Sequence, residues 1–449
     1  MHLIRHAALL CLVLAAGASA QQPDSTRRKA IADSIAKARQ DSIELQRELE
    51  KAMAQPSTKP APTQGPVQGF GPTNPRLLPD VSAVGDFVGD FTPTGSTQED
   101  LTRLRVREVE LAFQAVVDPY FRGDIFLGLS DLEKVSIEQA FLTTTGIRDL
   151  EIRLGRYLAP FGKENTVHRH DLHTVEYPWV IQRFLSPDAL KATGVYASHV
   201  FAPFGFYQEI QGTIGDRLGE PPEDLRPVAP LNKNLTGMMF LGRFRNYWDL
   251  TQATNLELSA SALTGRVEQP ILVSSPLVNG GVFTPATSQV NAIGARQSLL
   301  GIDLTYRWRP LQQGLYRSFM LQAEVMHQIN ERITVVPACA ELGFTVADCT
   351  RTAFGGPGRD FTGAYAFARW QITTRGFLGA RYDWVQDPLD PLQGGRNLIA
   401  GSGYFEWYPS EFSKLVVAYE RLDQPGFDPF NRILLQASFA LGPHKPHPF

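Results

Sequence analysis

From residue 81 to residue 441 the sequence repeats one short period, in which apolar side chains occupy every second position of many segments. In residues 300–309, Leu300, Ile302 and Leu304 alternate with small, polar or ionised residues. The same alternation recurs in residues 150–155, 256–262 and 378–384. A period of two places successive side chains on opposite faces of a β-strand. These segments therefore predict strands with one apolar face and one polar face.

The connections between the expected strands differ in length in a regular way. Those after even-numbered strands are short, whereas those after odd-numbered strands include every long segment, with the short connection near 130–134 as an exception. This pattern, with aromatic residues at the strand ends, is typical of a closed barrel in a membrane. The predicted fold class is all-β, a transmembrane antiparallel β-barrel of about sixteen strands, preceded by a short N-terminal α-helical coiled-coil segment. The expected strands are 81–91, 103–117, 120–129, 134–145, 149–158, 192–202, 205–214, 236–246, 253–264, 292–309, 315–330, 359–374, 376–386, 397–408, 412–421 and 429–441.

Composition excludes several other classes. The 43 Lys and Arg residues against 46 Asp and Glu give a net charge of −3, so no positive field for nucleic acid exists. The hydrophobic fraction of 43% is too high for a disordered chain, and three cysteines are too few for a disulfide scaffold. After the N-terminus, no stretch approaches the ~20 apolar residues that a spanning helix needs. We expect no nucleic-acid partner, and strands rather than helices in contact with outer-membrane lipid.

Three segments are expected ahead of the barrel domain, which spans 81–449. Residues 1–20 combine an apolar run with a small-residue cleavage site and predict a secretory signal peptide. Residues 21–55 contain apolar positions spaced by threes and fours, which predicts a periplasmic helix of about three heptads; a lone frayed helix is the alternative. Residues 56–80 are rich in Pro, Gly and Thr and predict an extended linker. This order predicts the outer membrane of a Gram-negative-type bacterium, with the cell wall within reach of the helix.

Export also bears on the two cysteines of the mature chain. Cys339 and Cys349 are ten positions apart within one expected loop. In an oxidising compartment this spacing predicts a local disulfide, and two unpaired cysteines are the alternative.

The charges of residues 103–110 break the simple alternation. Arg103, Arg105 and Arg107 share one phase, whereas Glu108 and Glu110 share the other. A β-bulge near Arg107 would bring all five side chains to the same face, the lumen side.

The segment that leads into the third long loop carries a family resemblance. Residues 155–162, Gly-Arg-Tyr-Leu-Ala-Pro-Phe-Gly, resemble the Gly-x-x-x-x-Pro-Phe-Gly segment of the phosphate-selective porin O and P family. The signal, the helical seam and the sixteen-strand pattern are similar to that family as well. The resemblance implies a homotrimeric outer-membrane channel whose third loop folds inward and narrows the pore. It also implies that the barrel-assembly machinery reads the C-terminal strand and Phe449. The prolines of the tail depart from this pattern because they cannot extend a strand ladder, so Phe439 is the alternative terminal aromatic.

The resemblance further implies ladders of lumenal Arg and Lys in phosphate-selective members, and this sequence departs from that pattern. Its polar strand phase carries both signs of charge, which favours a mixed-charge wall without solute preference, although arginine could contact phosphate bidentately. We expect a water-filled channel for passive transport of small polar or ionic solutes, anions such as phosphate among them. No enzyme motif is recognised and no cofactor is expected. The expected pore-lining residues are Arg153, Arg243, Arg245, Arg307, Arg309, Arg369, Arg381, Glu151 and Asp303.

The third loop itself contains a histidine cluster. His168 and His170 place two imidazoles on one side of an extended segment, and neutral imidazole binds zinc, copper or nickel. A metal site here would need a carboxylate or water as a further ligand; otherwise the histidines bond the loop to the inner wall. The alternative function is an outer-membrane binding or tethering protein with a metal-binding histidine loop. The expected constriction residues are Lys163, Glu164, His168, Arg169, His170, Asp171 and His173.

Overall fold

The structure, a computed structural model, describes the barrel region of the chain with several gaps. The described residues are 79–98, 101–130, 135–218, 237–267, 270–279, 282–291, 295–330, 334–335, 354–355, 360–387, 397–425 and 427–442. The signal peptide, the N-terminal helix, almost all of the linker, Cys339, Cys349 and Phe449 lie outside them. The predictions for those segments therefore stay predictions.

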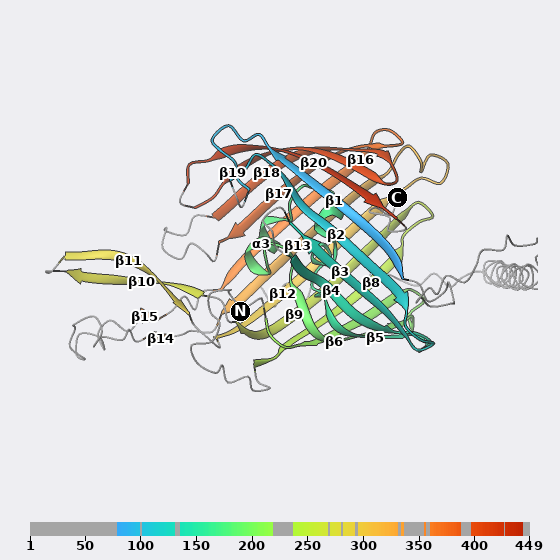
Figure 1. Cartoon of the computed structure of the whole chain (residues 1–449), viewed down its shortest axis with the longest axis horizontal. Coiled ribbons are helices and arrows are strands. Elements are labelled where there is room, and N and C mark those ends of the chain that lie inside the picture. Colours follow the sequence, from blue (N-terminus) through green and yellow to red (C-terminus); the bar gives the residue numbers. More distant parts are fainter. Residues whose placement is uncertain are drawn as a thin grey trace, which may run out of the picture. The chain divides into compact units, whose positions relative to one another are not determined.

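Sixteen antiparallel strands form a closed barrel, in which each strand pairs with its neighbours and β1 pairs with β20 (Figure 1). The predicted fold class is confirmed, and no strand boundary differs from its prediction by more than four residues. The strands are β1 (Asp80–Asp90), β2 (Leu104–Val116), β3 (Phe121–Leu129), β4 (Val135–Thr144), β5 (Leu150–Leu158), β6 (Lys191–Phe201), β7 (Tyr207–Gly215), β8 (Met239–Asp249), β9 (Thr254–Val267), β12 (Ala295–Trp308), β13 (Phe319–Asn330), β16 (Phe361–Gln371), β17 (Gly376–Gln386), β18 (Asn397–Ser410), β19 (Ser413–Asp423) and β20 (Phe430–Leu441).

Several elements lie in segments that were expected to be loops. Strands β10 (Pro270–Asn279) and β11 (Val282–Asn291) form a hairpin, and β14 (Thr334–Val335) pairs with β15 (Phe354–Gly355). Two glycines between two runs rich in β-branched residues are a hairpin signal, which the loop assignment at 265–291 overlooked. The third long loop contains a six-residue helix, α3 (Trp179–Phe184), and two 3-10 turns, η2 (Glu164–Thr166) and η3 (Arg169–Asp171). None of the helices in the described part of the chain has the length and apolar character to cross a membrane.

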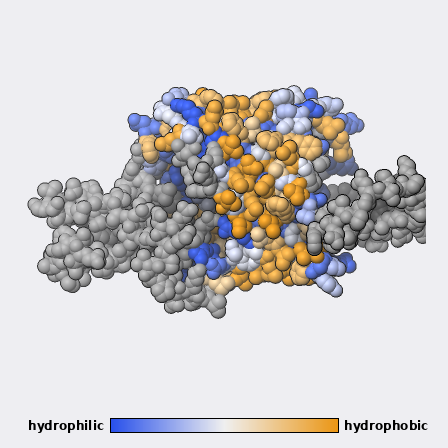
Figure 2. Space-filling view, viewed as in Figure 1, coloured by the Kyte–Doolittle hydropathy of each residue, from blue (hydrophilic) through white to orange (hydrophobic). Residues whose placement is uncertain are grey.

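The two faces of the strands differ as the alternation predicts. On β12, Leu300 and Ile302 are each 42% exposed, whereas Asp303 is 1% exposed. On β19, Leu415, Val417 and Tyr419 are exposed while the residues between them are buried. Hydrophobic side chains cover much of the middle of the barrel's outer face, and hydrophilic ones are more frequent toward its two ends (Figure 2). The outer face therefore has the apolar band that lipid-facing strands require.

The expected bulge lies at Arg107. The register of β1 with β2 shifts between Asp86 and Phe87, which pair with Glu108 and Val106, so that Arg107 is the extra residue. The side chains of Arg105, Arg107 and Glu110 are buried, and Glu108 lines a cavity inside the barrel. Arg103 differs from the expectation, because it precedes β2 and donates to the carbonyl oxygen of Thr92 in the first loop.

The apolar band yields a stability prediction. Ile302 lies near the middle of β12 on the outer face, so Ile302→Arg should destabilise the barrel in lipid vesicles by about 2–4 kcal/mol. The matched control is Gln114→Arg, because Gln114 faces the interior and lines a cavity there. Denaturant unfolding followed by tryptophan fluorescence measures both. Equal losses from the two variants would contradict a lipid-facing outer surface.

Candidate functional site

The third long loop runs from the end of β5 at Leu158 to the start of β6 at Lys191, and it folds into the barrel. Its apolar side chains join those of the inner wall in the largest buried cluster. From the loop the cluster takes Phe161, Leu172, Tyr177, Trp179, Val180, Ile181, Phe184 and Leu185; from the wall it takes Leu299, Met326, Tyr365, Phe367 and Leu398, among others. Helix α3 lies inside the barrel against β16 and β17 (Figure 1). The expectation of an inward-folded third loop therefore agrees with the described structure.

Both glycines of the sequence motif meet a specific steric demand. Gly155 lies on β5, where an added Cβ would come within 2.1 Å of the backbone oxygen of Ala140 on β4. Gly162 has a φ of +62°, and a Cβ there would lie 2.3 Å from Oε2 of Glu324 on β13. Glu324 Oε1 accepts hydrogen bonds of 2.8 Å from the next two backbone N–H groups, of which the first is that of Lys163. The motif thus turns the loop away from β5 and fastens it to β13.

Charged wall residues hold the rest of the loop by its backbone. Lys414, which is fully buried, donates to the carbonyl oxygens of His170 (2.6 Å) and Leu172 (2.7 Å). Two wall arginines also donate to carbonyl oxygens of the loop, Arg107 to that of Val175 (2.8 Å) and Arg381 to that of Glu176 (2.8 Å). Asp383 accepts a hydrogen bond from the backbone N–H of Trp179 (2.9 Å). The loop is therefore bonded to strands on several sides of the barrel, and its position inside is fixed.

Residues that the structure describes border two cavities inside the barrel, one on each side of this loop. A cavity of about 480 Å³ lies toward the short turns and is bordered by Gln114, Arg153 and His168. A second, of about 330 Å³, lies toward the long loops and is bordered by Gln98 and Arg169. Since adjacent loop residues border different cavities, the segment at 168–169 separates the two.

The expected lumenal arginines are paired with carboxylates. Arg243 and Arg381 are buried, and Arg153, Arg245 and Arg369 are partly exposed. Their ion pairs are Arg153–Glu151 (2.7 Å), Arg243–Asp303 (3.1 Å), Arg245–Glu209 (2.7 Å), Arg369–Glu406 (2.7 Å) and Arg381–Asp383 (2.7 Å). A buried cation without such a partner would be strongly unfavourable. The interior wall is thus mixed and largely neutralised in charge.

Two of the expected pore-lining arginines lie differently from the others. Arg307 is only loosely paired, with Nη1 3.9 Å from Glu257 Oε2. Arg309 lies beyond the end of β12, in the following turn, where its Nε donates to the carbonyl oxygen of Gly314. Strand phase alone placed Arg309 in the lumen, but the strand ends before it.

Most of the expected constriction residues serve as anchors. Lys163 forms an ion pair with Glu257 (2.8 Å), and Glu164 accepts a hydrogen bond from Gln322 (2.6 Å). Arg169 forms an ion pair with Glu176 (2.6 Å). His173 Nδ1 lies 3.4 Å from Glu406 Oε2. Burial raises the pKa of the Glu164 carboxyl and lowers the pKa of the His173 imidazole. Burial favours a raised pKa for the Glu176 carboxyl as well, but the charges of Arg169 and Arg107 outweigh burial and lower this pKa to about 2. These groups fix the loop, and Lys163 and Arg169 also border the two cavities.

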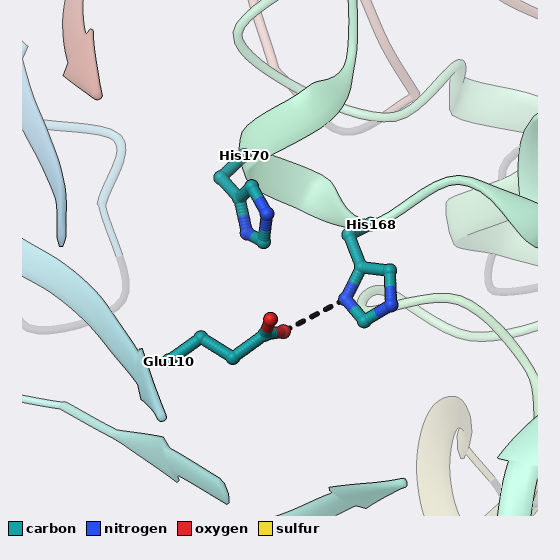
Figure 3. Close-up of side chains that lie close together, drawn as sticks. All are labelled: Glu110, His168 and His170. Carbon is teal, nitrogen blue, oxygen red and sulfur yellow. Dashed lines mark ion pairs between the residues drawn. The ribbon is translucent and has the colours of Figure 1, made fainter. Parts of the chain in front are cut away.

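His168 and His170 meet a carboxylate that the sequence did not single out as a partner. Glu110 on β2 points at the two imidazoles, and its Oε2 lies 2.8 Å from His168 Nδ1 (Figure 3). One ligand atom from each of the three residues lies within 4.8 Å of the others. Glu164 does not join this group, because its carboxylate accepts a hydrogen bond from Gln322. Asp171 lies beside His170, with 3.7 Å between Asp171 Oδ2 and His170 Nε2. The position of Glu110 follows from the phase of β2 after the bulge, but its meeting with His168 depends on the path of the loop.

The Glu110 carboxylate also governs the protonation of His168. Burial disfavours the imidazolium, but the hydrogen bond to Glu110 and its negative charge outweigh burial and raise the pKa of His168 to about 9. On the other side of the ring, Gln139 Nε2 lies 2.7 Å from His168 Nε2, while Gln139 Oε1 accepts from the backbone N–H of Leu158. A metal ion bound by His168 would have to displace its proton.

The anchoring of the loop can be tested at Gly162. Gly162→Ala imposes a left-handed backbone on a residue with a Cβ, at about 1 kcal/mol, and also forces that Cβ against Glu324. Gly146→Ala is the matched control, because Gly146 has a φ of +81° with no atom within 4 Å of the added Cβ. We predict that only Gly162→Ala speeds amide hydrogen exchange across residues 163–188, measured by mass spectrometry. Unchanged exchange in that variant would show that the motif does not anchor the loop.

Comparison with known proteins supports the fold and leaves the family open. No protein-family model matches the chain. An uncharacterized protein of Aquifex aeolicus (strain VF5) is 23% identical over 418 residues, which cover 83% of this chain and 80% of that protein. Among solved structures, a loop L8 deletion mutant of OmpT, an outer membrane protein of Vibrio cholerae, is similar with a TM-score of 0.50 and 10% identity, over 81% of this chain and 99% of that one. The outer membrane channel DcaP of Acinetobacter baumannii gives a TM-score of 0.47, with 10% identity over 81% of this chain and 98% of that one. Because only 10% of the aligned residues are identical, the structural similarity to the OmpT variant shows the barrel fold and no more.

Proposed function

We propose that this chain is an outer-membrane porin, a channel for passive transport of small polar and ionic solutes. The observation that carries the proposal is the contrast between the two faces of one closed sheet. The outer face is apolar, whereas the inner face carries ion pairs and borders two cavities. Closed sheets with this contrast enclose water in a membrane, because hydrocarbon cannot solvate polar groups.

The loop supports a channel that selects by width. It narrows the interior between the two cavities, where residues 168 and 169 lie. Solute passage then depends on the width of this constriction and on the charges that border it. The loop's backbone bonds to the wall give the constriction a defined position, as a size filter requires.

The charge pairing argues for weak discrimination between ions. An anion ladder would need arginines that offer unoccupied N–H groups to successive solutes. Here Arg153, Arg243, Arg245, Arg369 and Arg381 each lie beside a carboxylate. Phosphate is one of the anions such a lining would admit, without the strong preference that the family resemblance implies. The trimeric assembly that the resemblance implies stays a prediction.

Single-channel recording tests the proposal. Purified protein in planar bilayers should give discrete ohmic conductance steps, and a silent bilayer would contradict a pore. Arg153 and Glu151 form a matched pair at the larger cavity, with the Arg153 guanidinium also 5.0 Å from the centre of the Tyr196 ring. In a salt gradient, Arg153→Gln should shift the reversal potential toward cation preference and Glu151→Gln toward anion preference. The double variant should return close to the wild-type value, because the removed charges cancel.

A further inference from the structure

The strongest unassigned feature inside the barrel is the group formed by Glu110, His168 and His170. The histidines belong to the third loop and the carboxylate belongs to β2, so the loop fold brings together residues distant in the chain (Figure 3). In the part of the chain that the structure describes, no other group of three His, Cys, Asp or Glu ligand atoms is this close. Two imidazoles and a carboxylate, completed by water, are a ligand set that zinc uses.

The carboxylate has an unused ligand atom. Glu110 is 2% exposed, and its Oε1 accepts no hydrogen bond from the described residues, whereas Oε2 faces His168. A buried carboxylate oxygen without a donor is unfavourable, and a cation would remove that cost. This atom is the second observation, besides the clustering itself, that points to a missing ligand.

The surrounding contacts hold the three ligands in place. Lys414 fixes the carbonyl oxygen of His170, and Tyr177 donates from its hydroxyl to the carbonyl oxygen of Val167 at 2.6 Å. These two bonds fix the backbone next to both histidines and so limit where the imidazoles can lie. Zinc binding requires the three ligand atoms, now within 4.8 Å of one another, to come to ~2.0–2.2 Å from the ion.

The group can be reached from the interior of the barrel. Glu110 and His170 are buried, but the His168 side chain is 21% exposed and borders the cavity of about 480 Å³. An ion that enters this cavity meets His168 first. His168 lies at the segment that separates the two cavities, so a bound ion would tie the loop to β2 at the boundary between them.

We propose that Glu110, His168 and His170 form a binding site for a divalent transition-metal ion of the zinc type. Binding at this place fastens the loop to the wall and reduces passage between the cavities. The binding itself does not depend on the proposed function, whereas the effect on passage rests on it.

Isothermal titration calorimetry of the detergent-solubilised full chain with ZnCl₂ tests the binding, with MgCl₂ as the hard-cation comparison. We expect one zinc ion per chain at this site. Glu110→Gln and His170→Gln should each lower the zinc affinity at least ~10-fold, because even changes to the hydrogen-bond partners of metal ligands cost that much. His173→Gln is the matched control, because His173 lies in the same loop but contacts Glu406. The zinc affinity of His173→Gln should equal that of the wild type. All titrations use a background in which His444 and His447 are replaced by Ala, so that the tail contributes no zinc heat.

The outcomes separate the site from the function. No zinc heat, or equal heat in wild type and in Glu110→Gln that folds to the same heat-resistant barrel, overturns the site. In planar bilayers, micromolar zinc should lower the wild-type conductance reversibly with EDTA and leave that of Glu110→Gln unchanged. Zinc binding in a protein that forms no channel would overturn the proposed function while the site stands. Channels without zinc binding would overturn the site alone.

Discussion

The pairing of β1 with β20 is the interaction on which the rest of the structure depends. Eight residue pairs, from Ala83↔Leu441 to Asp90↔Leu434, close the sheet on itself. An open sheet would expose a row of backbone N–H and C=O groups at each edge, and hydrocarbon offers such groups no partner. Closure therefore permits an apolar outer face in a membrane, and it creates an enclosed interior lined by the other half of the side chains.

That interior has its own constraint, because its charges must find partners. Lys414 is fully buried, and its ammonium group bonds to two carbonyl oxygens of the third loop. Glu324 accepts from two backbone N–H groups of the same loop, and Asp383 accepts from a third. Without the loop these wall charges would lose those bonds, and the loop without the walls would expose its apolar residues. Wall and loop therefore stabilise each other, and the space left inside the barrel is whatever the loop does not fill.

The sequence predicted the strands well because their signal is local. Alternation in residues 300–309 and the charge phase around Arg107 each depend on a few neighbouring positions, and the register shift at Asp86 and Phe87 agrees with the expected bulge. The loop was predicted only in outline. Its folding inward followed from a motif, but its contacts join positions far apart, such as Lys163 with Glu324 and His170 with Lys414. No local pattern carries such pairings, and the partnership of Glu110 with His168 was missed for the same reason.

The central claim is that neighbouring strand residues face different solvents, and cysteine accessibility tests it most directly. In a variant in which Cys11, Cys339 and Cys349 are replaced by Ser, single cysteines are placed at Thr143 and Arg153, which border the larger cavity, and at the outward-facing Leu142 and Leu154. In lipid vesicles, a small membrane-impermeant maleimide should label Thr143→Cys and Arg153→Cys. Fluorophores attached at the other two positions should instead be quenched by brominated lipid. Equal labelling and equal quenching at all four positions would contradict the claim.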